Sequence, residues 1–286
     1  MRIKDALHRS RFSKQPTLSE VPRVVNPPED VFRRYFVAQG SPIVIVGSRM
    51  FADERRTLDD ILRPGAADVV VHVRGGDYLH GKRQYEDMSF AEYVERYIRP
   101  AESGAQDGAG ALPRYAGNSP LSHEDFLALG FRYPECFEGR PFDSPRLWFG
   151  PKGSLTPLHY DSRDNLICQY IGTKRLTLYP PSQIPYLYTR SYAPAWSGIA
   201  DPRRPDLQKF PLFARAKAVE VTLNAGEVLY LPKKWGHFVV NVETSLMVNF
   251  WPEYTSAQKL TIGLREKAGR VKRRLLAYRA LPRPVH

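Results

Sequence analysis

The chain has 286 residues, of which 42% are apolar and 25% charged, and this composition is typical of a globular protein with a core. No run of about 18 apolar residues occurs, so we expect no transmembrane helix. Two cysteines, Cys136 and Cys168, are too few for a disulfide framework, and the basic start of the chain lacks the apolar stretch of a secretory signal; both observations predict a cytoplasmic protein.

The net charge of +12 is concentrated at the two ends of the chain. Residues 1–25 contain six Lys or Arg against two acidic residues, and residues 259–286 contain nine against one, so residues 26–258 are neutral. A nucleic-acid channel through the middle of the chain is therefore not indicated. The basic ends can contact nucleic acid, a membrane surface or an acidic partner, but a solvated surface explains them equally well.

The first half of the chain predicts short helices that alternate with short strands. Residues 1–25 show no regular pattern. Helices are expected at 31–39, after a Pro-rich entry, at 53–62, and at 88–98, where Ser89 and Glu92 form a capping box. Apolar runs predict strands at 43–47 and 69–74. Residues 101–113 are small and Gly-rich and predict a flexible loop, and a further helix is expected around 123–129.

The second half, from Arg146 onward, is rich in strand patterns. Turn residues separate short β-rich runs, as in an antiparallel double sheet or barrel; the runs are 147–150, a strand that contains His159, and 165–172, 174–181, 218–226, 227–235, 237–243 and 245–251. Residues 182–213 have no clear period and predict an insertion between strands. From residue 256 the apolar residues fall on one stripe, which predicts a basic C-terminal helix. We therefore expect a mainly β fold with flanking helices.

Three residues stand out as candidate metal ligands. His159 and Asp161 are two positions apart, so in a strand their side chains point the same way, and His237 follows 78 positions later at the start of another predicted strand. Two imidazoles and one carboxylate can occupy one face of an Fe(II) ion and leave the opposite positions open. The alternatives are a Zn²⁺- or Mn²⁺-dependent isomerase or hydrolase, and a degenerate site with structural residues only.

The motifs around these residues resemble those of the JmjC-type (cupin-8) 2-oxoglutarate oxygenases. The His-x-Asp pair, the strands NLICQYIGTKRLTLYPP and GEVLYLPKKWGH, and VNFW occur in the order of that family, and the resemblance covers about residues 20–255. In pattern the chain is most similar to the asparaginyl hydroxylase that modifies hypoxia-inducible factor and to its bacterial relatives. The resemblance implies a double-stranded β-helix core at 146–252 within a catalytic domain at 26–255, flanked by the basic segments 1–25 and 256–286.

The resemblance also implies the roles of particular residues. His159, Asp161 and His237 would bind Fe(II), and Lys174 would anchor the distal carboxylate of 2-oxoglutarate. Tyr115 and Thr156 would help to hold this carboxylate, while Asn165 and Asn249 would line the same cosubstrate site. O₂ would be the second cosubstrate. A dianion in a partly dry pocket needs a cationic partner, which is the physical reason for the lysine.

The resemblance implies hydroxylation of an amino-acid side chain of a protein or peptide. N-methyl demethylation, hydroxylation of a tRNA base or a small molecule, and non-catalytic binding remain alternatives. Trp251 would wall the substrate pocket. Arg163, where the family often has a neutral amide, would face an acidic group on the substrate, unless it pairs with a local acid such as Asp164. Related hydroxylases dimerise through C-terminal helices, so a homodimer is expected.

Overall fold

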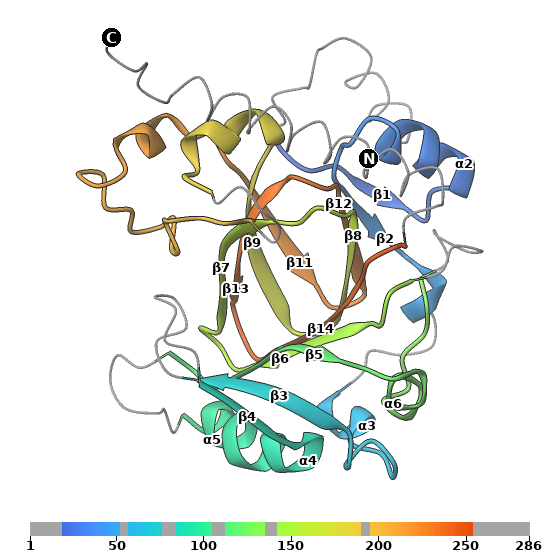
Figure 1. The fold of residues 1–286 in the computed structure, drawn as a ribbon. Helices are drawn as coiled ribbons and strands as arrows, with labels where there is room; N and C mark the ends of the chain where they lie inside the picture. Colours follow the sequence, from blue (N-terminus) through green and yellow to red (C-terminus); the bar gives the residue numbers. More distant parts are fainter. Residues whose placement is uncertain are drawn as a thin grey trace, which may run out of the picture. The chain divides into compact units, whose positions relative to one another are not determined.

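A computed structural model describes residues 19–51, 57–75, 84–104, 112–134, 142–189 and 195–253. Within these residues the strands form two sheets (Figure 1). The large sheet has the order β1-β2-β12-β8-β14-β6-β5-β3-β4, and the small sheet has the order β10-β7-β13-β9-β11. All neighbouring strands are antiparallel except β1 and β2, which run parallel. The two sheets face each other, as the expected double-stranded β-helix requires.

The strands of the large sheet are β1 (Arg23–Val25), β2 (Ile43–Val46), β3 (Val70–Gly75), β4 (Gln84–Ser89), β5 (Tyr115–Pro120), β6 (Arg146–Gly150), β8 (Asn165–Ile171), β12 (Glu227–Leu231) and β14 (Ser245–Phe250). Those of the small sheet are β7 (Leu155–Tyr160), β9 (Thr173–Tyr179), β10 (Ala195–Trp196), β11 (Val219–Asn224) and β13 (Gly236–Asn241). The β-rich runs predicted after Arg146 are thereby confirmed.

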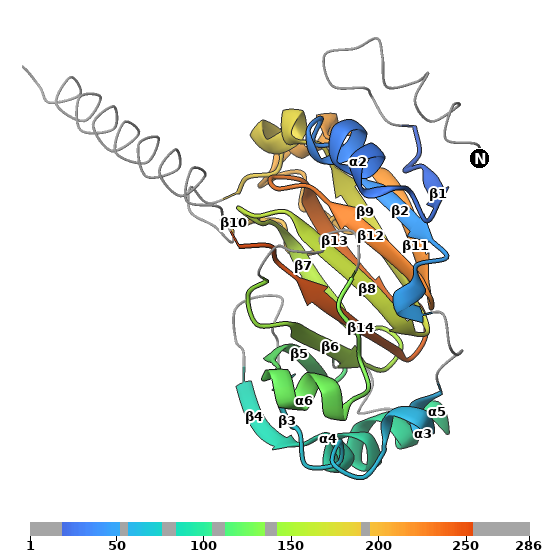
Figure 2. The same ribbon diagram turned by 90° about the vertical axis from the view of Figure 1, so that its right-hand side faces the viewer.

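The helices are short and lie outside the sheets. They are α2 (Glu29–Phe32), η1 (Arg33–Val37), η2 (Arg49–Phe51), α3 (Leu58–Ile61), α4 (Phe90–Tyr93), η3 (Val94–Ile98), α5 (Arg99–Glu102), α6 (His123–Ala128), η5 (Pro181–Tyr186) and η6 (Pro211–Arg215). Helices α3, α4 and α5 cover the β3–β4 end of the large sheet (Figure 2). No helix in the described part of the chain is long and apolar enough to cross a membrane.

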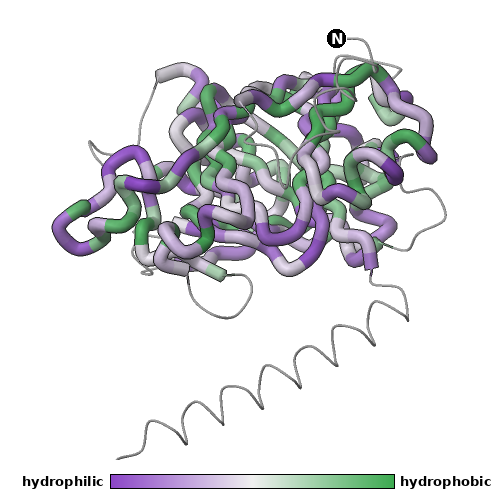
Figure 3. The backbone as a smooth tube through the Cα atoms, turned by 90° about the horizontal axis from the view of Figure 1, so that it is seen from above, coloured by the Kyte–Doolittle hydropathy of each residue, from purple (hydrophilic) through white to green (hydrophobic). Residues whose placement is uncertain are grey.

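The central strands β8 and β14 of the large sheet are buried on both faces because each face packs against a different partner. On β8 the side chains of Leu166, Cys168 and Tyr170 join the core that includes the helices, whereas Ile167 joins the core between the two sheets. Near-continuous apolar runs are typical of such doubly covered strands. In Figure 3 many hydrophobic stretches run through the interior, and hydrophilic stretches mark turns at the periphery.

The space between the sheets also holds polar side chains. On β6, Leu147 and Phe149 join the core on the helix side, so the period-two alternation directs Arg146 and Trp148 to the other face. The same alternation on β3 places Arg74 on the inward face, because Val71 and Val73 join the helix-side core. Polar side chains that are buried between two sheets need hydrogen-bond partners. A functional site is therefore expected in the space between the sheets.

Several predicted element boundaries differ from the structure. The irregular segment 1–25 contains β1, and the helix predicted at 88–98 begins after the strand residues Met88 and Ser89. Ser89 is the N-cap as predicted and accepts a hydrogen bond from Glu92 N, but the reciprocal bond of a capping box is not formed. Only 58–61 is helical in the described part of 53–62. Three residues of β1 are too few for a periodic signal.

Some predictions fall outside the described residues. The C-terminal helix from 256, Cys136, residues 1–18 and most of the Gly-rich loop belong to this group. Cys168 is a buried free thiol on β8. The segment 182–213 contains η5, β10 and η6, of which β10 joins the small sheet, so it is an insertion that carries one short edge strand.

Candidate active site

His159 and His237 meet because their strands pair. They are direct Cα partners in the antiparallel ladder of β7 and β13, and facing residues in such a ladder have Cβ atoms only about 4.5–5.5 Å apart. Their ring centroids are 4.1 Å apart, and both side chains are buried. Pairing between distant segments of the chain thus brings together two histidines that are 78 positions apart.

Asp161 completes the cluster from a position just beyond the end of β7. One oxygen of its carboxylate lies 3.8 Å from His159 Nε2 and the other lies 4.0 Å from His237 Nε2. All three candidate ligand atoms lie within 4.8 Å of one another, and no other such group of His, Cys, Asp or Glu occurs in the described ranges. Since metal–ligand bonds are about 2.0–2.2 Å long, one ion fits between these atoms.

Both imidazoles are oriented for metal binding. Nδ1 of His159 bonds the carbonyl of Pro157 at 2.8 Å, and Nδ1 of His237 bonds that of Trp235 at 3.0 Å. A backbone carbonyl on one ring nitrogen fixes the ring and leaves Nε2 as the ligand atom. Burial, followed by the nearby His237, lowers the pKa of His159 to about 3, so this imidazole is neutral, as a metal ligand must be.

Neighbouring side chains hold the ligands in place. Asn165 Nδ2 and Trp251 Nε1 both lie 3.4 Å from Asp161 Oδ2 and donate to it. The Trp196 ring stacks on His159, with centroids 4.5 Å apart and an interplanar angle of 26°, because β10 pairs with β7 at this position. Trp196 was not predicted as a site residue, since it lies within the insertion and no motif marks it.

Lys174 lies in a second polar cluster between the sheets. Its side chain is fully buried, and its ammonium donates to the hydroxyl of Tyr115 at 3.3 Å and to Oδ1 of Asn241. Both partners are neutral, and no carboxylate among the described residues contacts the ammonium. Burial, and then the charge of Arg74, lower the pKa of Lys174 well below its usual value of 10.5. A buried ammonium without an acid is costly, which fits a site for an anionic ligand.

Arg74 is a second cation in this cluster that the sequence analysis missed. Its guanidinium donates to the Thr156 hydroxyl at 3.2 Å and lies 4.6 Å over the Tyr115 ring. It runs past Gly117, where a Cβ atom would come within 2.8 Å of Arg74 Nε. Tyr115 and Thr156, predicted for the carboxylate site, thus lie with Lys174 and Arg74 in one cluster.

A β-bulge lets Thr156 and His159 share a face although they are three residues apart. His237 pairs with His159 and Val239 pairs with Thr156, so two residues of β7 oppose Phe238 alone. Such a bulge reverses the alternation of side chains. Pro157 lies in the bulge, where a missing N–H is tolerated. Because of the bulge, His159 of the candidate metal ligands and Thr156 of the cluster around Lys174 point to the same side of β7.

Asn249 and Asn165 are buried with unused hydrogen-bonding capacity. The Oδ1 atoms of both have no hydrogen-bond partner in the ranges that the structure describes. The same is true of the buried Nε1 of Trp148, a ring over which Arg74 lies at 5.2 Å. Buried polar atoms without partners are rare in proteins, so these three fit a site that receives a polar ligand.

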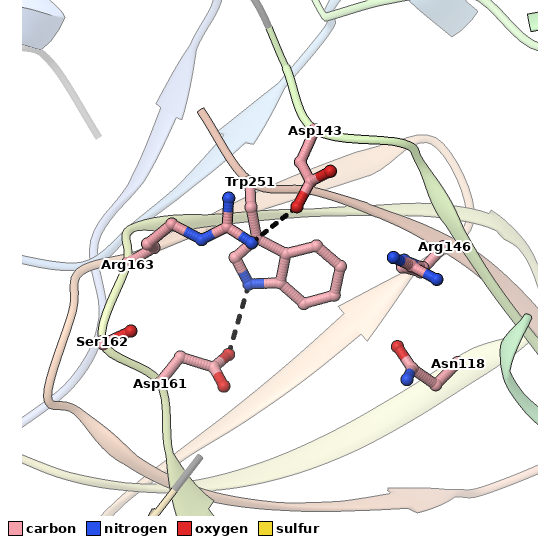
Figure 4. A pocket seen from close by; sticks show the side chains of 7 residues that line it. All are labelled: Asn118, Asp143, Arg146, Asp161, Ser162, Arg163 and Trp251. Carbon is pink, nitrogen blue, oxygen red and sulfur yellow. Dashed lines mark hydrogen bonds and ion pairs between the residues drawn. The ribbon is translucent and has the colours of Figure 1, made fainter. Parts of the chain in front are cut away.

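A cavity of about 370 Å³ opens beside Asp161 (Figure 4). Arg163 lines it, but its guanidinium bonds Asp143 at 2.8 Å. This bond is the main cause that lowers the pKa of Asp143. Arg163 therefore pairs with an acid, and that acid is Asp143 rather than Asp164, which accepts from Lys233 N. Trp251 also lines the cavity, and its role as a wall of the substrate pocket stays a prediction.

The comparisons with known proteins agree with this geometry. The family model described as "Cupin-like domain" matches residues 28–257. The chain belongs to the cupin-like domain family. This cupin-like chain is 28% identical to JmjC domain-containing protein D of Dictyostelium discoideum, over 83% of the chain and 55% of that protein.

Two further relatives of the cupin-like chain carry different functional names. It is 30% identical to lysine-specific demethylase 8 of Danio rerio, over 81% of the chain and 58% of the relative. It is 29% identical to tRNA wybutosine-synthesizing protein 5 of Gallus gallus, over 83% of the chain and 78% of the relative. The chain thus spans little more than half the length of two of these relatives. Membership in this family, with relatives named for JmjC domains, supports an oxygenase.

Proposed function

We propose that this chain is an Fe(II)- and 2-oxoglutarate-dependent dioxygenase that hydroxylates an amino-acid side chain of a protein or peptide. One observation carries the proposal: three convergent ligands lie next to a cluster where a fully buried lysine has only neutral hydrogen-bond partners. His159, Asp161 and His237 would hold the iron. Lys174, Arg74, Tyr115 and Thr156 would hold the distal carboxylate of 2-oxoglutarate.

The residues of the chain supply position, charge and exclusion of water. When bound together, Fe(II), 2-oxoglutarate and O₂ supply the oxidation of a C–H bond, with one oxygen atom going to the substrate and one to succinate as CO₂ is lost. Asn165 and Trp251 donate to Asp161 and fix its carboxylate. Lys174 and Arg74 neutralise the cosubstrate's charge in a buried site, where an uncompensated anion would be costly.

The donor set favours iron and an oxo acid over a hydrolase centre. Two imidazoles and one carboxylate with open positions are typical of non-haem Fe(II) oxygenases, whereas a Zn²⁺ hydrolase has no need for the buried cations next to its ligands. A non-catalytic binding protein would likewise have no reason to retain an intact ligand set beside Lys174. The cation cluster therefore supports the proposed function over both alternatives.

The proposal is tested by product analysis. The purified chain is incubated aerobically with Fe(II), ascorbate, 2-oxoglutarate and a peptide library, and succinate and peptide masses are measured. We expect succinate together with peptides that gain one oxygen atom. His159→Ala and Asp161→Ala should abolish both products, whereas Arg175→Gln, at an exposed strand position, should not. A folded wild-type chain that forms no succinate with any substrate would contradict the proposal.

The same assay separates the alternative substrates. The names of two relatives refer to lysine demethylation and tRNA wybutosine synthesis, and both N-methyl groups and tRNA bases are possible targets for the same centre. Loss of one CH₂ unit from methylated peptides would indicate demethylation. If succinate forms only with tRNA, the substrate is a tRNA base rather than a protein or peptide. If it forms only with small metabolites, the substrate is a small molecule.

A further inference from the structure

The cavity beside Asp161 has two differently charged sides. On one side Arg163 and Asp143 form an ion pair next to the candidate metal ligand. On the other side Arg146 and Asn118 lie together, away from Asp161 (Figure 4). Trp251 lies between the two sides and donates to Asp161. A group that enters this cavity therefore meets the reacting centre at one end and Arg146 with Asn118 at the other.

The guanidinium of Arg163 is paired with a carboxylate of the protein, whereas that of Arg146 is not. Both oxygens of Asp143 accept hydrogen bonds, one from Arg163 and the other from the backbone N–H of Ser144. Of the groups that shift the pKa of Asp143, Arg146 has the smallest effect. No hydrogen bond or ion pair links the Arg146 side chain to any residue in the described ranges. Arg146 is thus a half-buried guanidinium whose donors face the cavity.

Arg146 owes its position to strand alternation. It lies on β6 two residues before Trp148, which packs in the core between the sheets. Its Cα partner on β14 is Asn249, whose Oδ1 is one of the buried atoms without a partner. The regular ladder thus places Arg146 on the face of the sheet that carries the candidate site residues.

Asn118 owes its position to a bulge. Gly117 pairs with Trp148 and Ser119 pairs with Leu147, so Asn118 is an extra residue on β5. Its φ of +63° is in the left-handed region, which asparagine tolerates better than most residues. Bulges next to active sites commonly redirect a side chain, and here the bulge places the amide of Asn118 in the cavity wall.

We propose that Arg146 and Asn118 form a recognition site for a carboxylate of the substrate, opposite the reacting centre. This inference rests on the proposed function and specifies its substrate: an acidic residue of a peptide, or a free acidic amino acid. A planar guanidinium matches a carboxylate in two parallel hydrogen bonds, and the amide of Asn118 adds a neutral donor. The cavity volume of about 370 Å³ suits a group of side-chain size.

A phosphate group fits the same cavity less well. Asp143 and Asp161 line the cavity, and a phosphate dianion would meet more repulsion from them than a carboxylate would. Residues 26–258 are neutral in sum, so the chain around the site lacks the basic footprint that a nucleic-acid backbone requires. The observations therefore favour a carboxylate over the phosphate of an RNA.

The test measures binding without turnover. The full chain is loaded with Zn²⁺, which has no redox chemistry, and with 2-oxoglutarate. Capped pentapeptides that differ only in a central Asp, Glu, Asn, Gln or Lys are titrated, and L-aspartate and L-glutamate represent the free acidic amino acids. The proteins are wild type, Arg146→Gln, Arg146→Glu and, as a matched arginine control at an exposed position on β9, Arg175→Gln.

Wild type and Arg175→Gln should bind an acidic peptide about 10- to 100-fold more tightly than its isosteric amide, the usual range for a charge-assisted hydrogen bond. Arg146→Gln should abolish this preference, and Arg146→Glu should shift it towards Lys. A peptide that binds more tightly than the corresponding free amino acid identifies the acid as part of a polypeptide, and the reverse order identifies a free acid.

Three results would overturn the inference. They are wild-type binding that does not distinguish acid from amide, an acid preference that Arg146→Gln retains, and an RNA oligonucleotide that displaces the peptides and depends on Arg146. Stabilisation of the wild type by Zn²⁺ with 2-oxoglutarate, measured as a rise in Tm, is scored separately. Its absence contradicts the proposed function, whereas the peptide preference alone decides the role of Arg146.

Discussion

At the scale of single residues, the most informative group is the buried ammonium of Lys174. A charge that is fully buried with neutral partners destabilises the protein that contains it, unless a ligand brings the opposite charge. The depressed pKa of Lys174 has the same cause. Because its pKa in the folded protein lies below the unfolded value of 10.5, the unfolded state binds more protons between the two values. The folded state therefore gains stability as pH rises through that window.

Replacement of this lysine should separate stability from ligand binding. Lys174→Met should raise the free energy of unfolding of the ligand-free protein by about 1–4 kcal/mol at pH 7, because an unpaired buried charge is removed. It should also abolish the rise in Tm that 2-oxoglutarate causes. Lys217→Met, at an exposed lysine, serves as control and should change neither quantity. A Lys174→Met protein that is less stable without ligand, yet still stabilised by 2-oxoglutarate, would contradict the assignment.

The affinity for 2-oxoglutarate should depend on pH. In the ligand-free protein burial disfavours the ammonium of Lys174 and lowers its pKa, whereas the bound dianion favours the ammonium and raises that pKa. Binding should therefore take up a proton between the lowered free pKa and the higher bound pKa, and the affinity should fall as pH rises through that window. Calorimetry in two buffers of different ionisation enthalpy measures this uptake. Proton release, or an affinity that rises with pH, would argue against a cation whose pKa is lowered.

The sequence identified the candidate metal ligands but missed Arg74, the second cation of the cluster around Lys174. His159 and Asp161 form a local motif, and Lys174 was assigned through the resemblance. Arg74 and Asn241 carry no local signal, because their roles arise from strand pairing and side-chain reach across the sheet. The interpretation of Arg163 as a contact for an acidic substrate was incomplete for the same reason, since its partner Asp143 lies 20 positions earlier.

At the scale of elements, turns and bulges decide which residues face the site. Gly172 connects β8 and β9 and thereby sets the register of Lys174. Its φ is +67°, and a Cβ atom there would come within 1.9 Å of the carbonyl oxygen of Thr244. Gly226, between β11 and β12, has a φ of +84° but no atom within 4 Å of its would-be Cβ. A Cβ atom at Gly226 would therefore cause backbone strain alone, whereas one at Gly172 would cause the same strain and a steric clash.

Alanine substitutions at these two glycines should differ in cost. Gly226→Ala should lower the free energy of unfolding by roughly 1–2 kcal/mol, the usual cost of a left-handed conformation. Gly172→Ala should cost roughly 2–5 kcal/mol, since overpacking adds about 1–3 kcal/mol to that strain. Denaturant unfolding of the full chain measures both. Equal losses of stability in the two variants would show that the β8–β9 turn has more room than the structure assigns to it.

Periodicity predicted most strands but not their irregularities. The apolar runs after Arg146 were sufficient to predict the strands that follow it and a double-sheet core. The bulges that place Thr156 between the sheets and Asn118 in the wall of the cavity could not be predicted, because a bulge depends on the partner strand. Alternation alone would place Thr156 and His159 on opposite faces. Strand β5 was missed because residues 115–120 contain Gly, Asn, Ser and Pro rather than a β-rich pattern.

At the scale of the whole molecule, the net positive charge lies in the two ends of the chain and not in the domain between them. Residues 259–286 carry a net charge of +8, and the described part of the chain does not include them. We expect them to account for most of the non-specific binding of the chain to polyanions. Removal of 259–286 should weaken binding to single-stranded RNA and flatten its dependence on salt. Unchanged affinity and salt slope, measured by fluorescence anisotropy, would exclude this role for the segment.

The predicted homodimer is a separate question for the same truncated chain. If residues 256–286 form a dimerisation helix, the mass in solution should fall to that of one chain when they are removed. The carboxylate preference proposed for Arg146 should persist in either case, because that site lies within residues 118–251. The cytoplasmic location, inferred from cysteine content and the N-terminal sequence, stays a prediction.

The central claim is that three protein ligands and a buried lysine together hold Fe(II) and 2-oxoglutarate. An anaerobic titration of the full chain with both tests this most directly, because a 2-oxo acid chelated to Fe(II) gives a visible charge-transfer absorption band. We predict that the band appears in the wild type, is absent in His237→Ala, and requires far more 2-oxoglutarate in Lys174→Met. A wild-type protein that binds Fe(II) but never develops the band at saturating 2-oxoglutarate would contradict the claim.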